Sequence, residues 1–426
     1  MNKNFLALGL AAALLAPQVA GAEGFAINEW SAEGVAMGGA RMFAEDDAAN
    51  VAYNPASITK VKGEVMKSSY TYLSPHGNYK LYDSNNDEIK GEPTHNKVHA
   101  GWAVGSYYVR QINDKEWFGI GAFPRFAMVS EFERESNAST NAFFSKLNGV
   151  SVTPTYAHKF DKKWSAAVGA EINYVGLELQ KNLVIPTAGV NGTTQIEGES
   201  YALGWNAAAN YAFDDKNEIG VVYRSRIKHS LEADLKGYGT KSPASPLVGS
   251  NDVFGNAYGV VTLPDSWDIG YNHKFDKKTR LELKATRTNW STYDALNVYF
   301  DKSLVGIPGI AESSPSAKNW SNGWRYAIGL EHNFSDKYAA MAGFAFDESS
   351  IPHDGGDFMV PTGLRRTYSI GARYNDKKQT VAVALGWMDV GNLDFAGHPE
   401  KGDAYSSAHA YDSFTKIASI SYQRKF

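Results

Sequence analysis

Residues 164–174 read WSAAVGAEINY, and this stretch decides the fold of the chain. Every second residue is apolar or aromatic, from Trp164 through Val168 to Tyr174, whereas the residues between them are small or polar. Successive side chains of a β-strand point to opposite faces, so this alternation predicts a strand with one apolar face. The same alternation returns near the C-terminus, at residues 338–346 and 381–387.

A short turn motif separates many of these stretches. Each copy has an aromatic residue, two or three polar residues and then a new strand-like run. Asp, Asn and Ser bond their own backbone in tight turns, so the motif predicts hairpins. The five copies begin at Phe160, Phe213, Phe275, Phe334 and Tyr374.

Three features favour a membrane barrel over a soluble β-sandwich. The strand-like runs have ten or more residues, which matches the roughly 9–11 residues of a membrane strand. Aromatic residues such as Trp164 and Tyr174 bracket the apolar face, as in the girdles of outer-membrane barrels. Short turns alternate with long polar loops, such as residues 183–200 and 237–256, which is the asymmetry of that class.

The runs predict an all-β fold, a closed antiparallel transmembrane barrel of fourteen strands. An even number returns both ends of the barrel to the periplasmic side, and closure is required because an open edge in lipid leaves backbone groups unpaired. The expected strands are residues 63–74, 94–109, 116–132, 149–160, 163–180, 200–213, 218–235, 258–275, 279–300, 320–334, 337–349, 363–374, 378–390 and 410–426.

The first residues indicate export. Lys3 is followed by an apolar stretch, residues 5–16, and by the small residues 20–22. These are the parts of a cleaved signal peptide, and the apolar stretch is too short for a membrane-spanning helix, which needs about 20 residues. We therefore expect a signal peptide over residues 1–22 and a location in the cell outer membrane.

The composition excludes several other classes of protein. The 426 residues include no cysteine, so a disulfide framework and a thiolate metal site are excluded. The formal net charge of −4 does not suggest a nucleic-acid partner, and a mean hydropathy of −0.36 does not suggest a helical membrane bundle.

Residues 23–61 do not follow the strand pattern. They are rich in Gly and Ala, and Pro55 within Asn54-Pro55-Ala56 interrupts regular structure. A barrel of fourteen strands has a lumen wider than its own side chains can fill. The segment has the right size to be a plug, and residues 62–426 then form the barrel.

Several short motifs run in order along nearly the whole mature chain. They include residues 24–29 (GFAINE), 31–34 (SAEG), 54–56 (NPA), 204–207 (GWNA), 263–267 (LPDSW) and 324–329 (WRYAIG). In these motifs the sequence resembles the FadL family of outer-membrane transporters for long-chain fatty acids and other hydrophobic compounds.

The resemblance implies an N-terminal hatch inside the barrel, with Phe25 and the Asn54-Pro55-Ala56 motif as gating residues. It also implies that extracellular loops collect the ligand and pass it to a pocket under the hatch N-terminus. The ligand then leaves sideways where strand three is kinked. In this sequence that stretch contains Phe123, Pro124, Arg125, Phe126 and Ala127, of which Ala127 stands where the family often has glycine.

A fatty-acid carboxylate would need a basic partner in the lumen. Arg224 and Arg226 share one parity of a predicted strand, and Arg325 is lumenal by its own parity. We consider these three residues as head-group candidates, with a lumen of mutual ion pairs as the alternative.

No catalytic or cofactor-binding signature is present. Ser, His and Asn residues are scattered without a local motif, and no phosphate loop or His-Glu-x-x-His motif occurs. His158, His273 and His332 share the outward parity of the turn aromatics, so we expect them in the interface girdle and not at a metal.

The sequence thus predicts a monomeric outer-membrane channel for a hydrophobic small molecule, with long-chain fatty acids as the first expectation. Membrane lipid and the barrel-assembly machinery, which would engage the final strand ending at Phe426, are the other expected partners. Two alternatives stay open: a general porin for small polar solutes, and a surface interaction or adhesion protein that uses its long loops.

Overall fold

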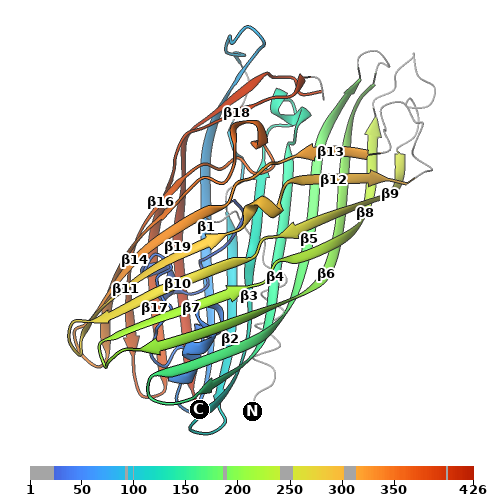
Figure 1. Cartoon of the computed structure of the whole chain (residues 1–426). Coiled ribbons are helices and arrows are strands. Elements are labelled where there is room, and N and C mark those ends of the chain that lie inside the picture. The colour runs from blue at the N-terminus through green and yellow to red at the C-terminus, as the bar shows by residue number, and fades with distance from the viewer. Residues whose placement is uncertain are drawn as a thin grey trace.

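The chain is built mainly from long antiparallel strands, as a computed structural model shows (Figure 1). The structure describes residues 24–91, 95–98, 100–185, 190–239, 253–301, 313–399 and 402–426. The predicted signal peptide, residues 1–22, lies outside the described residues.

The strands form one sheet that closes on itself, because β1 (Glu64–Tyr82) pairs both with β2 (Gly101–Gln111) and with β19 (Ser407–Lys425). Five barrel strands are each divided into two consecutive segments, so the nineteen described segments make fourteen barrel strands and confirm the predicted number. The undivided strands also include β3 (Glu116–Glu131), β4 (Phe144–Lys159), β5 (Trp164–Ile185), β6 (Val190–Ala212), β15 (Tyr338–Asp347) and β16 (Arg365–Asn375).

The divided strands correct the prediction of continuous runs at residues 218–235, 258–275 and 279–300. The first breaks at residues 225–226, the second at the Pro264-Asp265 pair, where proline has no N–H to donate, and the third at the 3-10 helix η4 (Trp290–Thr292). The segments are β7 (Asn217–Arg224) with β8 (Ile227–Gly239), β9 (Val253–Leu263) with β10 (Ser266–Lys274), β11 (Thr279–Thr288) with β12 (Ala295–Phe300), β13 (Ser313–Ala317) with β14 (Gly323–Asn333), and β17 (Gln379–Val390) with β18 (Leu393–Ala396).

The prediction of a long loop at residues 183–200 is also wrong in part. β5 continues to Ile185, and β6 begins at Val190, so this connection is an extended hairpin. A polar strand can continue the ladder once it has left the lipid, because the ladder is made by backbone groups.

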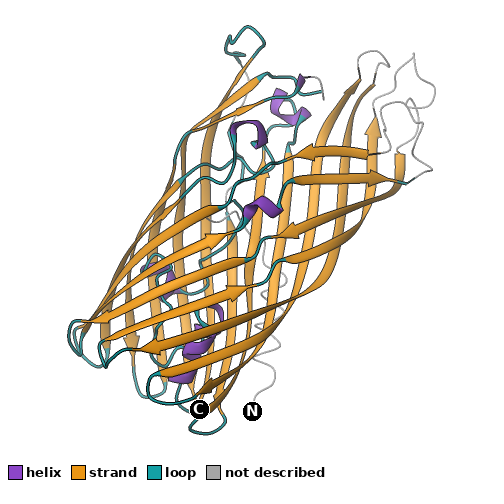
Figure 2. Ribbon diagram, viewed as in Figure 1, coloured by secondary structure: helices purple, strands orange, loops and turns teal. Residues whose placement is uncertain are grey.

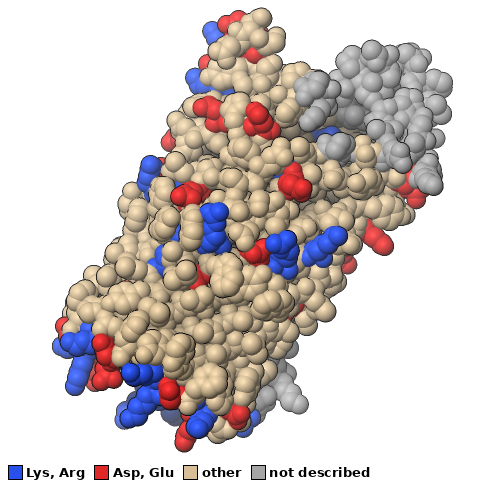
Figure 3. Space-filling model, viewed as in Figure 1, with Lys and Arg blue, Asp and Glu red and all other residues tan. Residues whose placement is uncertain are grey.

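The outer face carries apolar and aromatic side chains, as the alternation predicts. Trp164, Val168 and Ile172 on β5 are all exposed. Each girdle histidine packs edge-on against the turn phenylalanine two residues later, as His158 does with Phe160 at 4.7 Å between ring centroids. Figure 3 shows a band with few charged residues above a rim of Lys, Arg, Asp and Glu at the end of the barrel that carries the short turns.

The interior is filled by the N-terminal segment, which we define as residues 24–61. Its helices α2 (Ala32–Ala36) and α3 (Asn50–Tyr53) and its 3-10 helix η1 (Pro55–Lys60) lie within the ring of strands (Figures 1 and 2). Two further 3-10 helices, η2 (Asn137–Thr140) and η5 (His353–Gly355), lie in the loops at the opposite end from the short turns. None of the described helices is long and apolar enough to cross a bilayer.

The turn motif generates a prediction about pH. The carboxylate of Asp276 accepts the N–H groups of Lys278 and Thr279, both at 2.7 Å, and these bonds lower the pKa of Asp276. A carboxyl with a lowered pKa stabilises the folded state at pH values above its unfolded pKa of about 3.9. This stabilisation is lost as the pH falls through the pKa of the folded state.

Asp276→Ala should therefore unfold at lower urea concentration than the parent at pH 7, and the difference should vanish in strong acid. The exposed neighbour Lys277→Ala is the control, and an equal loss at both pH values would contradict the prediction.

Candidate functional site

The N-terminal segment is held against the barrel wall by close backbone contacts. Ser31 caps α2 by accepting the N–H of Gly34, and the N–H of Ala32 donates to Ser421 Oγ at 2.8 Å. A Cβ atom at Gly343 on β15 would lie 2.1 Å from the backbone carbon of Met37, so only glycine allows the segment to approach this closely. Small residues in both partners therefore seat the segment on the wall.

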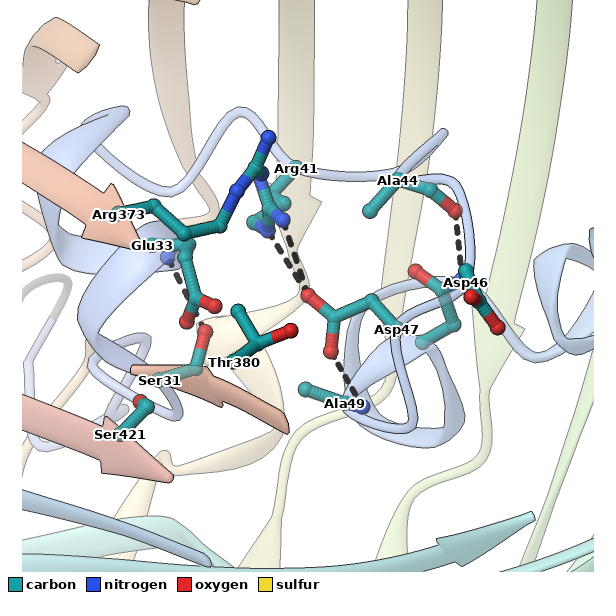
Figure 4. Close-up of polar contacts among 12 residues, drawn as sticks. Ser31, Glu33, Arg41, Ala44, Asp46, Asp47, Ala49, Arg373, Thr380 and Ser421 are labelled. Atoms are coloured by element: carbon teal, nitrogen blue, oxygen red, sulfur yellow. Dashed lines mark hydrogen bonds and ion pairs between the residues drawn. The ribbon is translucent and has the colours of Figure 1, made fainter. Parts of the chain in front are cut away.

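A buried ionic network also ties the segment to the wall. Lys67 on β1 donates to Glu33 at 2.8 Å and to Asp47 at 2.9 Å, and Arg41 pairs with Asp47 at 3.0 Å and with Glu331 on β14 at 3.2 Å. Figure 4 shows Arg41 turned toward Asp47, which also accepts the N–H of Ala49. Burial by itself would raise the pKa of Asp47, but Lys67 and Arg41 hold it well below its usual range.

The Asn54-Pro55-Ala56 motif forms the start of η1. The Asn54 side chain accepts the N–H of Ala56 at 3.2 Å, and Pro55 occupies the first helical turn, where no N–H is needed. The other end of the Asn54 amide donates to Asn210 on β6 at 2.8 Å, and Asn210 donates to Ser57 at 3.0 Å. The motif thus joins the segment to the opposite side of the wall.

Two of the three head-group candidates hold the N-terminal segment. Arg224 pairs with Asp268 at 2.6 Å and donates to the carbonyl of Ala52, while Arg325 pairs with Asp347 at 2.7 Å and donates to the carbonyl of Gly38. The expectation that Arg226 is lumenal is wrong. The break at residues 225–226 reverses the parity, so Arg226 is exposed on the outside and pairs with Asp265 at 3.2 Å.

The wall is interrupted beside strand β3. The last ladder pair between β2 and β3 joins Ser106 to Ala122, and from Phe123 onward, among the described residues, β4 is the only strand that β3 pairs with. The β3–β4 register shifts between Pro124 and Phe126, which leaves Arg125 as a bulge. Near the end of β3, the N–H of Lys97 donates to the carbonyl of Glu131. We call the interval between Ala122 and this bond the β2–β3 window.

The N-terminal segment supplies the hydrogen bonds that β2 does not make. Ile27 N–H donates to the carbonyl of Arg125, and Ala127 N–H donates to the carbonyl of Phe25, both at 2.8 Å. The Trp30 indole donates to the carbonyl of Pro124 at 2.6 Å. The predicted residues of strand three therefore meet the N-terminus of the segment directly.

The bulge turns Arg125 into the lumen. Its guanidinium bonds both carboxylate oxygens of Glu171, at 3.0 and 2.9 Å, and Ser151 donates to the same carboxylate. Ala127 is fully buried, and the Phe126 ring packs 6.0 Å from the Phe25 ring. Arg125 is thus satisfied within the protein, and Phe126 faces an apolar cluster.

This apolar cluster, which we call the Phe25 cluster, lies at the N-terminus of the segment. The Phe25 ring is fully buried, with ring centroids 4.7 Å from Trp290, 5.4 Å from Tyr293 and 5.8 Å from Trp320. Its aliphatic members come from several strands and from the loops: Met128, Leu147, Val175, Leu177, Leu179, Ile227, Leu231, Val261, Leu263, Leu296, Ile351 and Val360.

Sequence reasoning missed the aromatic part of this cluster. Trp290 falls within a stretch predicted as continuous strand, although the turn-forming residues Asn289 and Ser291 beside it are a signal for a break. It also missed Arg365 on β16, which donates to the carbonyl of Gly24 at 3.2 Å and places a buried cation beside the cluster. Nothing in the local pattern distinguishes that arginine from Arg366, which is exposed.

A fourteen-stranded barrel with an apolar outer face, a filled interior and an apolar cluster at an interrupted wall is the architecture of an outer-membrane channel. Over residues 13–422 the chain matches a family described as outer membrane protein transport protein (OMPP1/FadL/TodX). The chain belongs to this family of outer-membrane channels for hydrophobic compounds, which confirms the resemblance seen in the sequence.

The relatives agree with this assignment. The chain is 24% identical to the long-chain fatty acid transport protein of Escherichia coli O6:H1, over 94% of each chain. Its fold is similar to that of a Pseudomonas aeruginosa FadL homologue, with a TM-score of 0.82 and 18% identity over 95% of this chain and 100% of the other. The fold is also similar to that of the Pseudomonas putida toluene transporter TodX, with a TM-score of 0.70 and 16% identity over 95% of this chain and 100% of the other.

The ionic network generates a second prediction. Lys67→Met leaves Glu33 and Asp47 buried without their shared cation, and breaking such a pair costs roughly 3–5 kcal/mol. We expect the N-terminal segment to loosen, so that small-ion conductance in planar bilayers rises and the segment becomes sensitive to protease. Lys162→Met, on an exposed turn, is the control. A closed, protease-resistant Lys67→Met protein would show that the network does not hold the segment.

Proposed function

We propose that this protein takes up apolar compounds, with long-chain fatty acids as its principal ligands, through the Phe25 cluster and out sideways through the β2–β3 window. One observation carries the proposal: the N-terminal residues that complete the Phe25 cluster are the same residues that hydrogen-bond the unpaired edge of β3. A ligand that displaces Phe25 would also weaken the seal of the wall. In this scheme Phe25 is the gating residue.

The outer loops supply the first apolar surface that a ligand would meet. Phe358 is fully buried among Tyr79, Phe132 and Phe395, and its carbonyl accepts a hydrogen bond from Ser130 at the upper end of β3. A small cavity of about 60 Å³ beneath this cluster is lined by Met128, Met359 and Arg365, among others. This arrangement supports a path from the loops to the Phe25 cluster.

The Phe25 cluster offers partners for both parts of a fatty acid. Its aliphatic side chains suit an alkyl chain, and Arg365 beside Gly24 is a candidate for the carboxylate. Arg224 and Arg325 stay head-group candidates, and each would have to leave its carboxylate partner, Asp268 or Asp347, to bind a ligand. A carboxylate bound by Arg365 would compete with the Gly24 carbonyl and so loosen the N-terminus.

The aromatic members favour a second candidate ligand class. Four aromatic rings lie within 6.0 Å of the Phe25 ring, three of them edge-on, which is the arrangement that aromatic rings prefer. A monoaromatic hydrocarbon could replace the Phe25 phenyl group there. The toluene transporters in the family make this class chemically reasonable.

Lateral release suits such ligands better than an aqueous pore. Each buried methylene is worth about 0.8 kcal/mol, so a ligand that passes from the cluster directly into lipid avoids the cost of hydration. The filled interior argues against the porin alternative. Deletion of residues 24–61 should convert the protein into an open pore that lets small sugars swell liposomes, which the intact protein should not do.

Ligand binding can be followed through the tryptophans of the cluster. We expect oleate to change tryptophan emission and Trp290→Ala to weaken oleate binding roughly tenfold, since a well-packed aromatic contact contributes about 0.5–1.5 kcal/mol beyond its buried area. Trp164→Ala, in the outer girdle, should leave the affinity unchanged. Displacement of oleate by toluene at comparable concentration would favour the monoaromatic class, and no response to either ligand would refute the proposed site.

The lateral route can be closed reversibly, because the chain has no cysteine of its own. A disulfide in Val104→Cys/Pro124→Cys would join β2 to β3 across the window. Oxidation should then lower uptake of oleate by cells several-fold, and reduction should restore it. Ser106→Cys/Ala122→Cys joins the same strands at their last ladder pair and should have no effect. Full uptake through the oxidised window variant would mean that ligand leaves by another route.

A further inference from the structure

A second interruption of the wall lies between β6 and β8. The ladder pairs Glu199 of β6 with Glu232 of β8, and it resumes only where Asn206 pairs with Arg224 of β7. No ladder pair joins residues 200–204 to residues 227–231, all of which the structure describes. We call this interval, which is bounded by paired residues above and below, the β6–β8 window.

This second window lies in register with the first. Along the register from strand to strand, Phe126 pairs with Gly149, Gly149 with Val175 and Val175 with Ser200. The two windows therefore flank the upper parts of strands β3 to β6. Unlike the β2–β3 window, whose edge is bonded by residues 25–30, this one has no hydrogen bond to the N-terminal segment among its described residues.

The inner edge of the β6–β8 window opens on the Phe25 cluster. Ile227 and Leu231 of β8 are buried members of the cluster, and Ala202 of β6 packs against it. The Ile227 side chain lies over Gly204, so that a Cβ atom there would be 2.9 Å from Ile227 Cγ1. The Ser225 hydroxyl would lie 3.0 Å from the same Cβ atom. The buried His229 directs its Nε2 to Asn173, at 2.9 Å, and interacts with the backbone of Ser200 on the opposite edge. Ile227, with these two polar side chains beside it, closes the window from inside.

The outer edge faces lipid. Leu203 and Tyr201 on β6 are exposed to 77% and 69%, more than any other large hydrophobic residue described. Next to them, Trp205, Tyr223 and Trp267 form a chain of rings with centroids 5.0 and 4.7 Å apart, as in an outer aromatic girdle. Unpaired backbone in contact with lipid costs several kcal/mol per group, so the interruption is not a neutral feature of a barrel wall.

From these contacts we infer that the β6–β8 window is a second lateral passage, through which apolar ligand exchanges between the Phe25 cluster and the outer leaflet. Movement of the Ile227 side chain away from Gly204 opens it. The inference rests on the proposed uptake of apolar compounds but adds a route that does not require the N-terminal segment to move.

The first test detects the passage without any natural ligand. Ile227→Cys and Leu263→Cys each place one thiol in the Phe25 cluster at a fully buried position, but only Ile227 borders the window. An alkyl maleimide dissolved in phospholipid vesicles that contain the protein should modify Ile227→Cys several times faster. Equal rates would show that the window is sealed and would overturn the inference, whether or not the protein transports fatty acids.

The second test measures transport. Leu203 of β6 and Lys228 of β8 both face outward, and they lie opposite each other when the β6–β8 register is continued. A disulfide in Leu203→Cys/Lys228→Cys therefore joins the two edges of the window without filling the lumen. Oxidation should lower uptake of oleate and leave oleate binding unchanged. Glu199→Cys/Glu232→Cys, at an existing ladder pair, is the matched control and should transport normally. Unchanged uptake in the oxidised window variant would overturn the second passage, whereas absence of uptake and binding in the parent protein would refute the proposed function instead.

Discussion

Lipid offers no hydrogen-bond partner to the backbone, and the rest of this structure depends on that constraint. A wall of strands must close, as β1 and β19 do here, and at an interruption the backbone groups either find another partner or stay unpaired at a cost in free energy. At β3 the N-terminal segment is that partner, because residues 25–30 bond the edge that β2 leaves unpaired. The segment is thus part of the wall as well as the filling of the lumen.

The middle and the first residues of the N-terminal segment are attached by different kinds of interaction. Its middle is tied to the wall by buried ion pairs and by glycine contacts that leave no free space, as around Asp47 and Gly343. Its first residues are held by apolar packing and a few backbone bonds. An apolar ligand competes directly with packing of that kind and has no effect on buried ion pairs, so a change at Phe25 need not release the whole segment.

The repeated interruptions of the wall gather around the Phe25 cluster. The bulge at Arg125, the break at residues 225–226, the Pro264-Asp265 pair and η4 all contribute side chains at or next to it. If these strands were continuous, every second residue would face lipid, and the upper part of the wall would have no breaks that turn side chains inward. The breaks instead bring residues such as Ile227 and Trp290 inward, at the expense of ladder hydrogen bonds.

The sequence by itself determined the barrel, its fourteen strands and the outward aromatic faces, because strand periodicity and turn chemistry are local properties that read directly from stretches such as residues 164–174. The resemblance to the family also implied an irregularity of strand three near Pro124, a residue that cannot donate to a ladder. Only the tertiary structure decided that Arg226 faces outward, that Arg224 and Arg325 hold the N-terminal segment, and that Trp290 and Arg365 meet Phe25. Those outcomes depend on one-residue shifts of register and on contacts between residues hundreds of positions apart, and local periodicity carries no information about either.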